Sequence, residues 1–427
     1  MDAPLGFSVI ASLLMMILIT VDVTVGETAS EIPSVAGATG GGGRSYLGHI
    51  ETNVMMSKNL KAMAQISMVP ITSNETEIQA LLAFKARILI DPYGVSGSWN
   101  DSQHFCNGSN MRSAASKSHF PASFISQIGR RPSPYIANLT FLRVINLQNN
   151  SFRVPEQLYK ISSVNAFSLA ANKLQGHILR YIGLRLPNLK GIYLGGNNFS
   201  GEIPTSIVDS SGLMDLDRAN NALTELIPKN LGSLQNLTIL NFGGNLPESS
   251  NDLSLLTSLS NCTVLSILWL YQNNLTGVLP DSIGNLSTNL IGFRINSNYI
   301  SGTIPKEIGN LVGLEYLALH KNMLTGSMPD SIGKLSKLKH FDAYTNRIIG
   351  EIRHSLNRLN VTILKEAFSL CSHLIYLLFA SNSLTGTLPP EVGKFKDLDM
   401  MDASSNKLHG EIPSSLENCV MFESLHL

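Results

Sequence analysis

The chain repeats one arrangement of leucines around an asparagine many times. From residue 139 onward this arrangement reads LxxLxxLxLxxNxLxGxIP, where x stands for any residue. The commonest interval between copies is 24 residues, and their asparagines are Asn150, Asn172, Asn197, Asn221, Asn245, Asn273, Asn298, Asn322, Asn346, Asn382 and Asn406. Eleven near-complete copies do not arise by chance, so the pattern predicts a stack of similar coils.

One copy, LEYLALHKNMLTGSMP from residue 314, shows what each position is expected to do. Leu317 and Leu319 alternate with other residues along a short strand, so the leucines point inward and their neighbours outward. Asn322 ends the strand, where its amide can pair with backbone groups left open at a buried turn. Gly326 permits a tight backbone path, and Pro329 stops a helix from following at once.

A period of 24 residues falls inside the window of leucine-rich repeats, about 20 to 29 residues. A single repeat cannot bury its own leucines because the faces above and below it are apolar, so repeats must stack and both ends need caps. We therefore predict an α/β, β-rich solenoid. It is a right-handed leucine-rich-repeat superhelix with a concave parallel β-sheet, irregular segments outside, and a ligand surface on the concave strand faces.

The LxGxIP ending of the repeat resembles the plant-specific subclass found in receptor-like kinases and receptor-like proteins. It reads LTGVLP at 275–280, ISGTIP at 300–305 and LHGEIP at 408–413. Upstream, NETEIQALLAFKARILIDPYGVSGSWND from Asn74 is similar to the N-terminal cap of such repeat arrays. The closest resemblance is to the immune-receptor branch of the leucine-rich-repeat receptor-like kinases. That family senses peptides outside the cell and signals through an intracellular kinase.

The chain departs from the family pattern at several places, including the following three. The family cap has two paired cysteines in a CxWxGVxC stretch, but Cys106 is followed by NGSNMRSAAS, so no cap disulfide is expected. The interval of 36 between Asn346 and Asn382 is 12 short of two 24-residue repeats, which predicts that half a repeat is deleted. The sequence stops at Leu427 within a strand, which predicts a truncated ectodomain.

The predicted domain order follows from these features. Residues 1–26 contain an apolar run, Phe7 to Val21, that fits a signal peptide, with a soluble-core helix as the alternative. A linker at 27–73, a degenerate cap at 74–137 and an array of about 11 repeats at 138–427 follow. No second run is long enough to span a membrane. The expected location is secreted or the extracellular face of the plasma membrane, with membrane attachment only through the signal segment or a C-terminal span outside this sequence.

Export also predicts glycosylation at N-x-S/T sequons, which exceed the number expected by chance only modestly. The predicted acceptors are Asn74, Asn100, Asn138, Asn198, Asn236, Asn261, Asn274, Asn285 and Asn360.

Composition argues against several other classes of protein. Thirty-one basic residues balance 31 acidic ones without long runs of either sign, so nucleic-acid binding is not expected. The chain lacks HRD, DFG, HExxH and CxxC motifs, so neither an enzyme, a metal site nor a cofactor is predicted. Cys262, Cys371 and Cys419 stand just before repeat starts, where small buried hydrophobic side chains are expected.

Aromatic and charged residues recur at the outward strand positions of neighbouring repeats. Such side chains are enriched in binding hot spots, although tyrosine and tryptophan also simply favour strands. The candidate ligand-binding residues are Trp269, Tyr271, Arg294, Asn296, Tyr316, His320, His340, Asp342, Tyr344 and Tyr376.

The sequence thus predicts an extracellular ectodomain that binds a peptide or protein ligand. The resemblance implies a leucine-rich-repeat co-receptor as a second partner and a role in plant defence or developmental signalling. Two alternatives remain. One is a secreted inhibitor of a hydrolase, and the other is a full-length gene product with Ser/Thr kinase activity whose kinase part is absent here.

Overall fold

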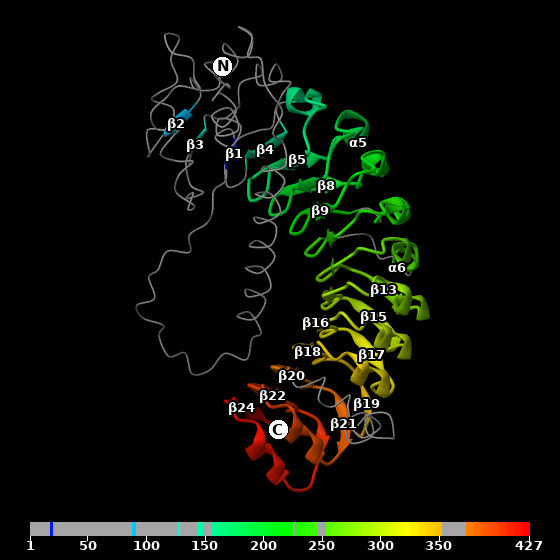
Figure 1. Cartoon of the computed structure of the whole chain (residues 1–427), viewed down its shortest axis with the longest axis vertical. Coiled ribbons are helices and arrows are strands. Elements are labelled where there is room, and N and C mark those ends of the chain that lie inside the picture. The colour runs from blue at the N-terminus through cyan, green and yellow to red at the C-terminus, as the bar shows by residue number, and fades with distance from the viewer. Residues whose placement is uncertain are drawn as a thin grey trace, which may run out of the picture. The chain divides into compact units, whose positions relative to one another are not determined.

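The computed structural model describes residues 143–147, 156–224, 227–245, 253–351 and 373–427 (Figure 1). It also describes three short strands, β1 (Leu18–Ile19), β2 (Ile88–Ile90) and β3 (Gln127–Ile128). Strand β2 pairs with β3 in antiparallel fashion. Apart from these strands, the predicted signal peptide, linker and cap lie outside the described residues. The chain divides into two compact units.

The first unit comprises Met1–Leu174 and Ile182–Asn197. Its strands β4 (Val144–Leu147), β5 (Ala166–Ser168) and β7 (Gly191–Tyr193) pair in parallel, and β1 pairs in parallel with β4. The register aligns Ile145, Phe167 and Ile192, which are all fully buried. A 3-10 helix, η4 (Glu156–Lys160), and the helix α5 (Ile182–Arg185) alternate with these strands. Each coil of this unit therefore has one strand with a buried apolar centre.

The second unit comprises Gln175–Tyr181 and Asn198–Leu427. Nine of its described strands form one parallel sheet, in which the chain order is also the spatial order. They are β9 (Asp215–Asp217), β11 (Ile239–Asn241), β12 (Ile267–Trp269), β14 (Gly292–Arg294), β16 (Tyr316–Ala318), β18 (His340–Asp342), β20 (Tyr376–Leu378), β22 (Met400–Asp402) and β24 (Ser424–His426). The predicted parallel sheet is confirmed by the parallel pairing of these strands. The middle residue of each strand from Leu216 to Met401 is buried, as the repeat pattern predicts.

Shorter strands and single-turn helices lie across from this sheet. The sheet follows the inner side of the unit's curve and the helices its outer side (Figure 1). The short strands form three small parallel sheets, composed of β6 (Gln175–His177), β8 (Asn198–Gly201) and β10 (Ala222–Leu223); of β13 (Thr276–Val278), β15 (Tyr299–Thr303) and β17 (Met323–Thr325); and of β19 (Ile349–Glu351), β21 (Ser383–Gly386) and β23 (Lys407–Leu408).

The helices correct one expectation from the sequence. The outer segments are mostly regular 3-10 turns, and η10 begins directly after Pro329, so the prediction that this proline stops a helix is wrong. The first N–H groups of a helix need no helical partner, so proline is well tolerated there. The outer helices are η5 (Thr205–Asp209), η6 (Lys229–Ser233), α6 (Ser254–Ser258), η7 (Leu259–Asn261), η8 (Asp281–Asn285), η9 (Lys306–Asn310), η10 (Asp330–Lys334), η12 (Pro390–Lys394) and η13 (Ser414–Asn418). Among the described residues, no helix has the length and hydropathy needed to cross a membrane.

The repeat asparagines join neighbouring coils, as Asn322 shows. Its Nδ2 donates to the carbonyl oxygen of Ile295 in the preceding coil at 3.1 Å and to that of Leu319 in its own coil at 3.0 Å. Its Oδ1 accepts from the backbone N–H of Ile300 at 3.0 Å. The pairing predicted for Asn322 is confirmed. The same two kinds of donation occur at Asn245, Asn273, Asn298, Asn346, Asn382 and Asn406.

The tight path predicted at Gly326 is also present. Its φ is 71°, and a Cβ atom there would lie 2.6 Å from Cγ2 of Thr303. Glycine is therefore required both by the backbone angle and by the space available.

The strands that precede Asn346 and Asn382 are neighbours in the sheet, despite the long interval between these asparagines. Strand β18 pairs directly with β20, and Nδ2 of Asn382 donates to the carbonyl of Ala343, 3.1 Å away. Among the described residues, the sheet therefore has no strand between β18 and β20. The segment in which half a repeat was predicted to be deleted lies outside the described residues. The strand and asparagine positions keep their register although the interval exceeds the 24-residue period by 12 residues.

One coil has a charged residue where the repeat requires an apolar one. Arg218 occupies the inward position filled by Phe242 in the next coil, and it is fully buried. Its three guanidinium nitrogens have no hydrogen-bond partner, and burial lowers the pKa of Arg218 to about 9. An unpaired buried charge is costly, so this coil carries a local defect in its core.

Candidate ligand-binding face

The ten candidate residues lie on neighbouring strands of the second unit, on the sheet face opposite the buried leucines. Strand register aligns Trp269 with Arg294, and Tyr316 with His340 and Tyr376. The other five stand at the strand ends or just beyond them. We call these ten residues the ridge. Nine of its side chains fall into three contacting groups that share Tyr316, and Asn296 stands outside them.

Arg294 is the centre of the first group. Its guanidinium carbon lies 5.1 Å from the ring centroid of Trp269, 4.5 Å from that of Tyr271 and 5.6 Å from that of Tyr316. These are cation–π distances. Arg294 is 3% exposed, and its Nε and Nη1 have no hydrogen-bond partner. The group thus links strands β12, β14 and β16 through one charged side chain.

A second group runs across three strands at the first strand position. The ring centroids of Tyr316 and His340 are 5.3 Å apart, and those of His340 and Tyr376 are 4.9 Å apart. All three side chains are half-buried. Burial, followed by the charge of Lys339, lowers the pKa of His340 to about 4. This row is therefore uncharged at neutral pH.

The third group places His320 flat against Tyr344, with centroids 4.3 Å apart and planes 8° from parallel. The Tyr316 hydroxyl donates to Oδ2 of Asp342 at 3.3 Å, and Nδ1 of His320 lies 3.9 Å from the same oxygen. Burial, then the charges of Arg294 and Lys321, lowers the pKa of His320 to about 3. The imidazole is neutral at pH 7, so this 3.9 Å contact is not an ion pair.

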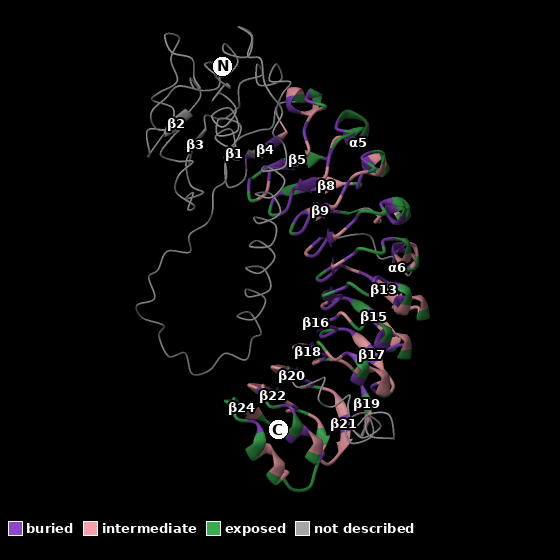
Figure 2. Cartoon of the chain, in the orientation of Figure 1, coloured by how far each residue is buried: buried purple, intermediate pink, exposed green. Residues whose placement is uncertain are grey.

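The ridge is less accessible than the sequence suggested. Its large side chains cover one another, so Trp269, Tyr271, Arg294, Asn296, His320 and Asp342 are at most 9% exposed. The exposed fraction rises along the sheet. Strands β9 to β14 are wholly buried, whereas β16 to β24 each begin with a half-buried residue (Figure 2). The accessible half of the ridge is its C-terminal half. Ligand binding by the ten residues remains a prediction.

Two accessible residues were missed in the sequence. Met400 follows Tyr376 in register at the first strand position, and Asp402 follows Leu378 at the third. Both are half-buried. They would have been found in the sequence if the outward strand positions had also been read in the repeat that follows Tyr376.

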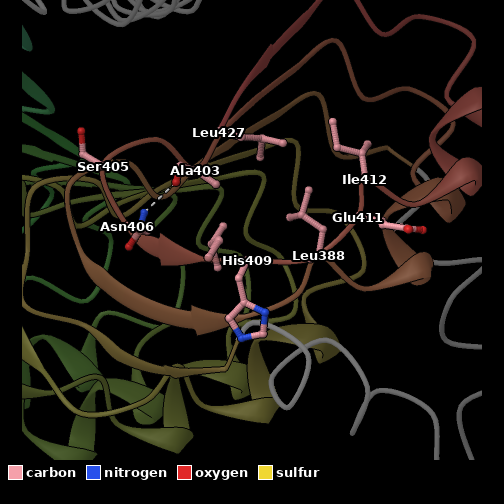
Figure 3. Close-up of a pocket in the computed structure, with 10 residues that line it drawn as sticks. Leu388, Ala403, Ser405, Asn406, His409, Glu411, Ile412 and Leu427 are labelled. Carbon is pink, nitrogen blue, oxygen red and sulfur yellow. Dashed lines mark hydrogen bonds between the residues drawn. The ribbon is translucent and has the colours of Figure 1, made fainter.

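Figure 3 shows a separate hollow of about 220 Å³ near the last coil, beside Leu427. Leu388, Ala403 and Leu408 line it. The equivalent residues of earlier repeats, Ile304, Leu319 and Leu324, are buried. The hollow is therefore a packing surface of a coil. No group of three or more metal-ligating side chains occurs within the part of the chain that the structure describes.

The described cysteines are structural. Cys262 and Cys419 are free and buried, with Sγ 3.3 Å from the carbonyl of Leu234 and 3.5 Å from that of Val392, respectively. Burial raises the pKa of the Cys262 thiol to about 11 and also raises that of Cys419. The prediction of small buried side chains is confirmed for these two. Cys106 and Cys371 lie outside the described residues.

Several predicted glycan acceptors are at the surface. Asn198, Asn236, Asn261 and Asn285 are exposed and Asn274 is half-buried. Glycosylation of these residues remains a prediction. Asn74, Asn100, Asn138 and Asn360 lie outside the described residues.

A parallel sheet on one side, 3-10 turns on the other and an asparagine at each turn define a leucine-rich-repeat solenoid. The model of the leucine rich repeat N-terminal domain matches residues 74–108, and that of the leucine rich repeat matches residues 188–209 and 264–286. The families matched in this chain are thus leucine-rich-repeat domains.

The curated relatives of this chain are mainly plant leucine-rich-repeat receptor kinases and receptor-like proteins. Receptor kinase-like protein Xa21 of Oryza sativa subsp. japonica is 45% identical over 95 residues, which cover 22% of this chain and 9% of that protein. Receptor-like protein 14 of Arabidopsis thaliana is 32% identical over 247 residues, 56% of this chain and 23% of that protein. The chain thus spans less than a quarter of the length of either relative.

Among solved structures, the chain resembles the Arabidopsis receptor kinase HAESA in complex with the peptide hormone IDA and the co-receptor SERK1. The TM-score is 0.66 at 27% identity, with coverage of 83% of this chain and 61% of that one. The predicted solenoid and the resemblance to plant leucine-rich-repeat receptors are therefore confirmed.

Proposed function

We propose that this chain is an extracellular ligand-binding module that binds a peptide or protein across the strand face of its repeat array. The observation that carries the proposal is the continuous row of side-chain contacts across strands β12 to β20, in which Arg294 joins Trp269 to the aromatic rings of Tyr316, His340 and Tyr376. Aromatic side chains give large contact areas at a small entropic cost, which is why they dominate binding hot spots.

The relatives support the finer parts of this proposal. One similar solved structure is a receptor kinase in complex with a peptide hormone and a co-receptor. We infer a peptide ligand and a leucine-rich-repeat co-receptor for this chain, at the outer face of the plasma membrane, in defence or developmental signalling. Within that system the chain acts as a binding surface, and any kinase activity belongs to a longer protein.

The test is a footprint of a bound peptide. A peptide selected from a random library on the full chain is added, and amide hydrogen exchange is compared with and without it. We expect slower exchange in strands β16 to β22 and unchanged exchange in η8, η9 and η10 on the other side. Protection confined to the outer helices, or the absence of any selectable peptide, would overturn the proposal.

A further inference from the structure

The accessible part of the strand face has a row of four side chains at the first strand position. Tyr316, His340, Tyr376 and Met400 are in register on β16, β18, β20 and β22, and all are half-buried. We call them the half-buried row. With about 4.8 Å between strands, three steps span about 14 Å, which matches an extended segment of about four residues at about 3.3 Å each.

Carboxylates lie beside this row on the same strands. Asp342 stands two residues after His340, and Asp402 two residues after Met400. Oδ1 of Asp402 accepts from the backbone N–H of Ser404 at 3.1 Å and from its hydroxyl at 2.7 Å, which fixes the carboxylate on the sheet. Asp399 and Glu423 immediately precede β22 and β24 and add further negative charge at the edge of the row.

Arg294 on β14 places one positive charge at the Tyr316 end of the row, 5.6 Å from that ring. The other positive charge close to the row is balanced or off the sheet. Lys339 pairs with Glu315 at 2.6 Å, and Lys321 is exposed in the turn after β16. The described strands β16, β18, β20, β22 and β24 contain no lysine or arginine. His320 and His340 are uncharged at neutral pH because of their burial. The face from β18 to β24 is therefore acidic as well as apolar.

Asp342 stands beside the ring of His320. Nδ1 of His320 is buried and lies 3.9 Å from Oδ2 of Asp342, which accepts from the Tyr316 hydroxyl at 3.3 Å. A carboxylate has about four lone-pair sites on its two oxygens, so Asp342 can also accept from an ammonium or guanidinium group.

We propose that the ligand of this face is a basic peptide with apolar or aromatic side chains. Its apolar side chains lie on the half-buried row, and its lysine or arginine side chains reach Asp342 and Asp402. This inference rests on the proposed function and specifies its ligand. Charge complementarity of this kind orients a ligand and excludes acidic competitors.

The test uses a random dodecapeptide library displayed on phage and the full chain as bait. Peptides that bind the chain but not its Tyr376→Ala variant are sequenced. We expect lysine plus arginine to exceed aspartate plus glutamate by about tenfold among them. The excess should fall to near parity for Asp402→Asn, and should persist for Asp281→Asn, an exposed carboxylate on η8.

The results separate the two proposals. Peptides that depend on Tyr376 but carry no excess of basic residues would overturn this inference and leave the proposed function standing. A basic excess that Asp281→Asn abolishes as fully as Asp402→Asn would also overturn it, because the attraction would then be unspecific. A library that yields no peptide dependent on the strand face contradicts both.

Discussion

At the scale of single residues, Arg218 is the clearest weakness of the fold. Its pKa falls from 12.5 to about 9 on burial, which corresponds to roughly 5 kcal/mol at about 1.4 kcal/mol per pKa unit. Arg218→Leu restores the repeat pattern and should raise the free energy of unfolding by several kcal/mol, to be measured by denaturant titration. The control is Arg180→Leu, since that side chain is 75% exposed. Equal stability of the wild type and Arg218→Leu would contradict the assignment of an unpaired buried charge.

Asp217 gives a prediction about pH. Burial is the main cause that raises the pKa of Asp217 to about 7, and the charge of Asp215 adds to it. The folded state binds this proton more tightly than the unfolded state does, so the stabilisation by protonation is present at low pH. It is lost as pH rises from about 4 to about 7, by at most about 4 kcal/mol.

Asp217→Asn removes this titration. Unfolding free energies measured from about pH 4 to about pH 8 should fall less steeply with pH in the variant than in the wild type. Parallel curves for the two proteins would show that Asp217 is not the group responsible.

At the scale of elements, the asparagine turn holds each coil to the next. Asn322→Ala leaves the carbonyls of Ile295 and Leu319 without this donor and the N–H of Ile300 without its acceptor. The two carbonyls keep the Nδ2 donors of Asn298 and Asn346, so the N–H of Ile300 is the group left without its hydrogen-bond partner. The loss of this hydrogen bond should lower the free energy of unfolding by about 2 kcal/mol. Thermal unfolding of Asn310→Ala, an exposed asparagine on η9, serves as the comparison. A loss of equal size in both variants would mean that the asparagine turn has no special role.

The elements also show how far sequence alone can predict this fold. The strand pattern and the hydrogen bonds of Asn322 followed from the repeat, because each depends only on residues within a coil and the next. The direct pairing of β18 with β20 did not, because spacing alone does not say whether an interval of 36 residues belongs to one coil or to parts of two. The burial of Trp269 and Arg294 was missed for a similar reason: it depends on large side chains from adjacent strands covering each other.

At the scale of the whole molecule, the exposure of the strand face changes along the sheet of the second unit. The strand face is closed around Arg294 and opens from β16 to β24. Trp269 therefore belongs to the packing of the face, and Tyr316, Tyr344 and Tyr376 are its accessible aromatic residues. Binding should therefore depend on these three tyrosines, and stability on the buried side chains around Arg294.

The most direct test of the account is calorimetric titration of a library-selected peptide against variants of the two sides of the solenoid. Tyr316→Ala, Tyr344→Ala and Tyr376→Ala should each weaken binding by at least about 2 kcal/mol, roughly thirtyfold. Lys306→Ala and Lys334→Ala, which change exposed residues of the outer helices, should leave affinity unchanged. Equal small effects on both sides would contradict the claim that the strand face is the binding site.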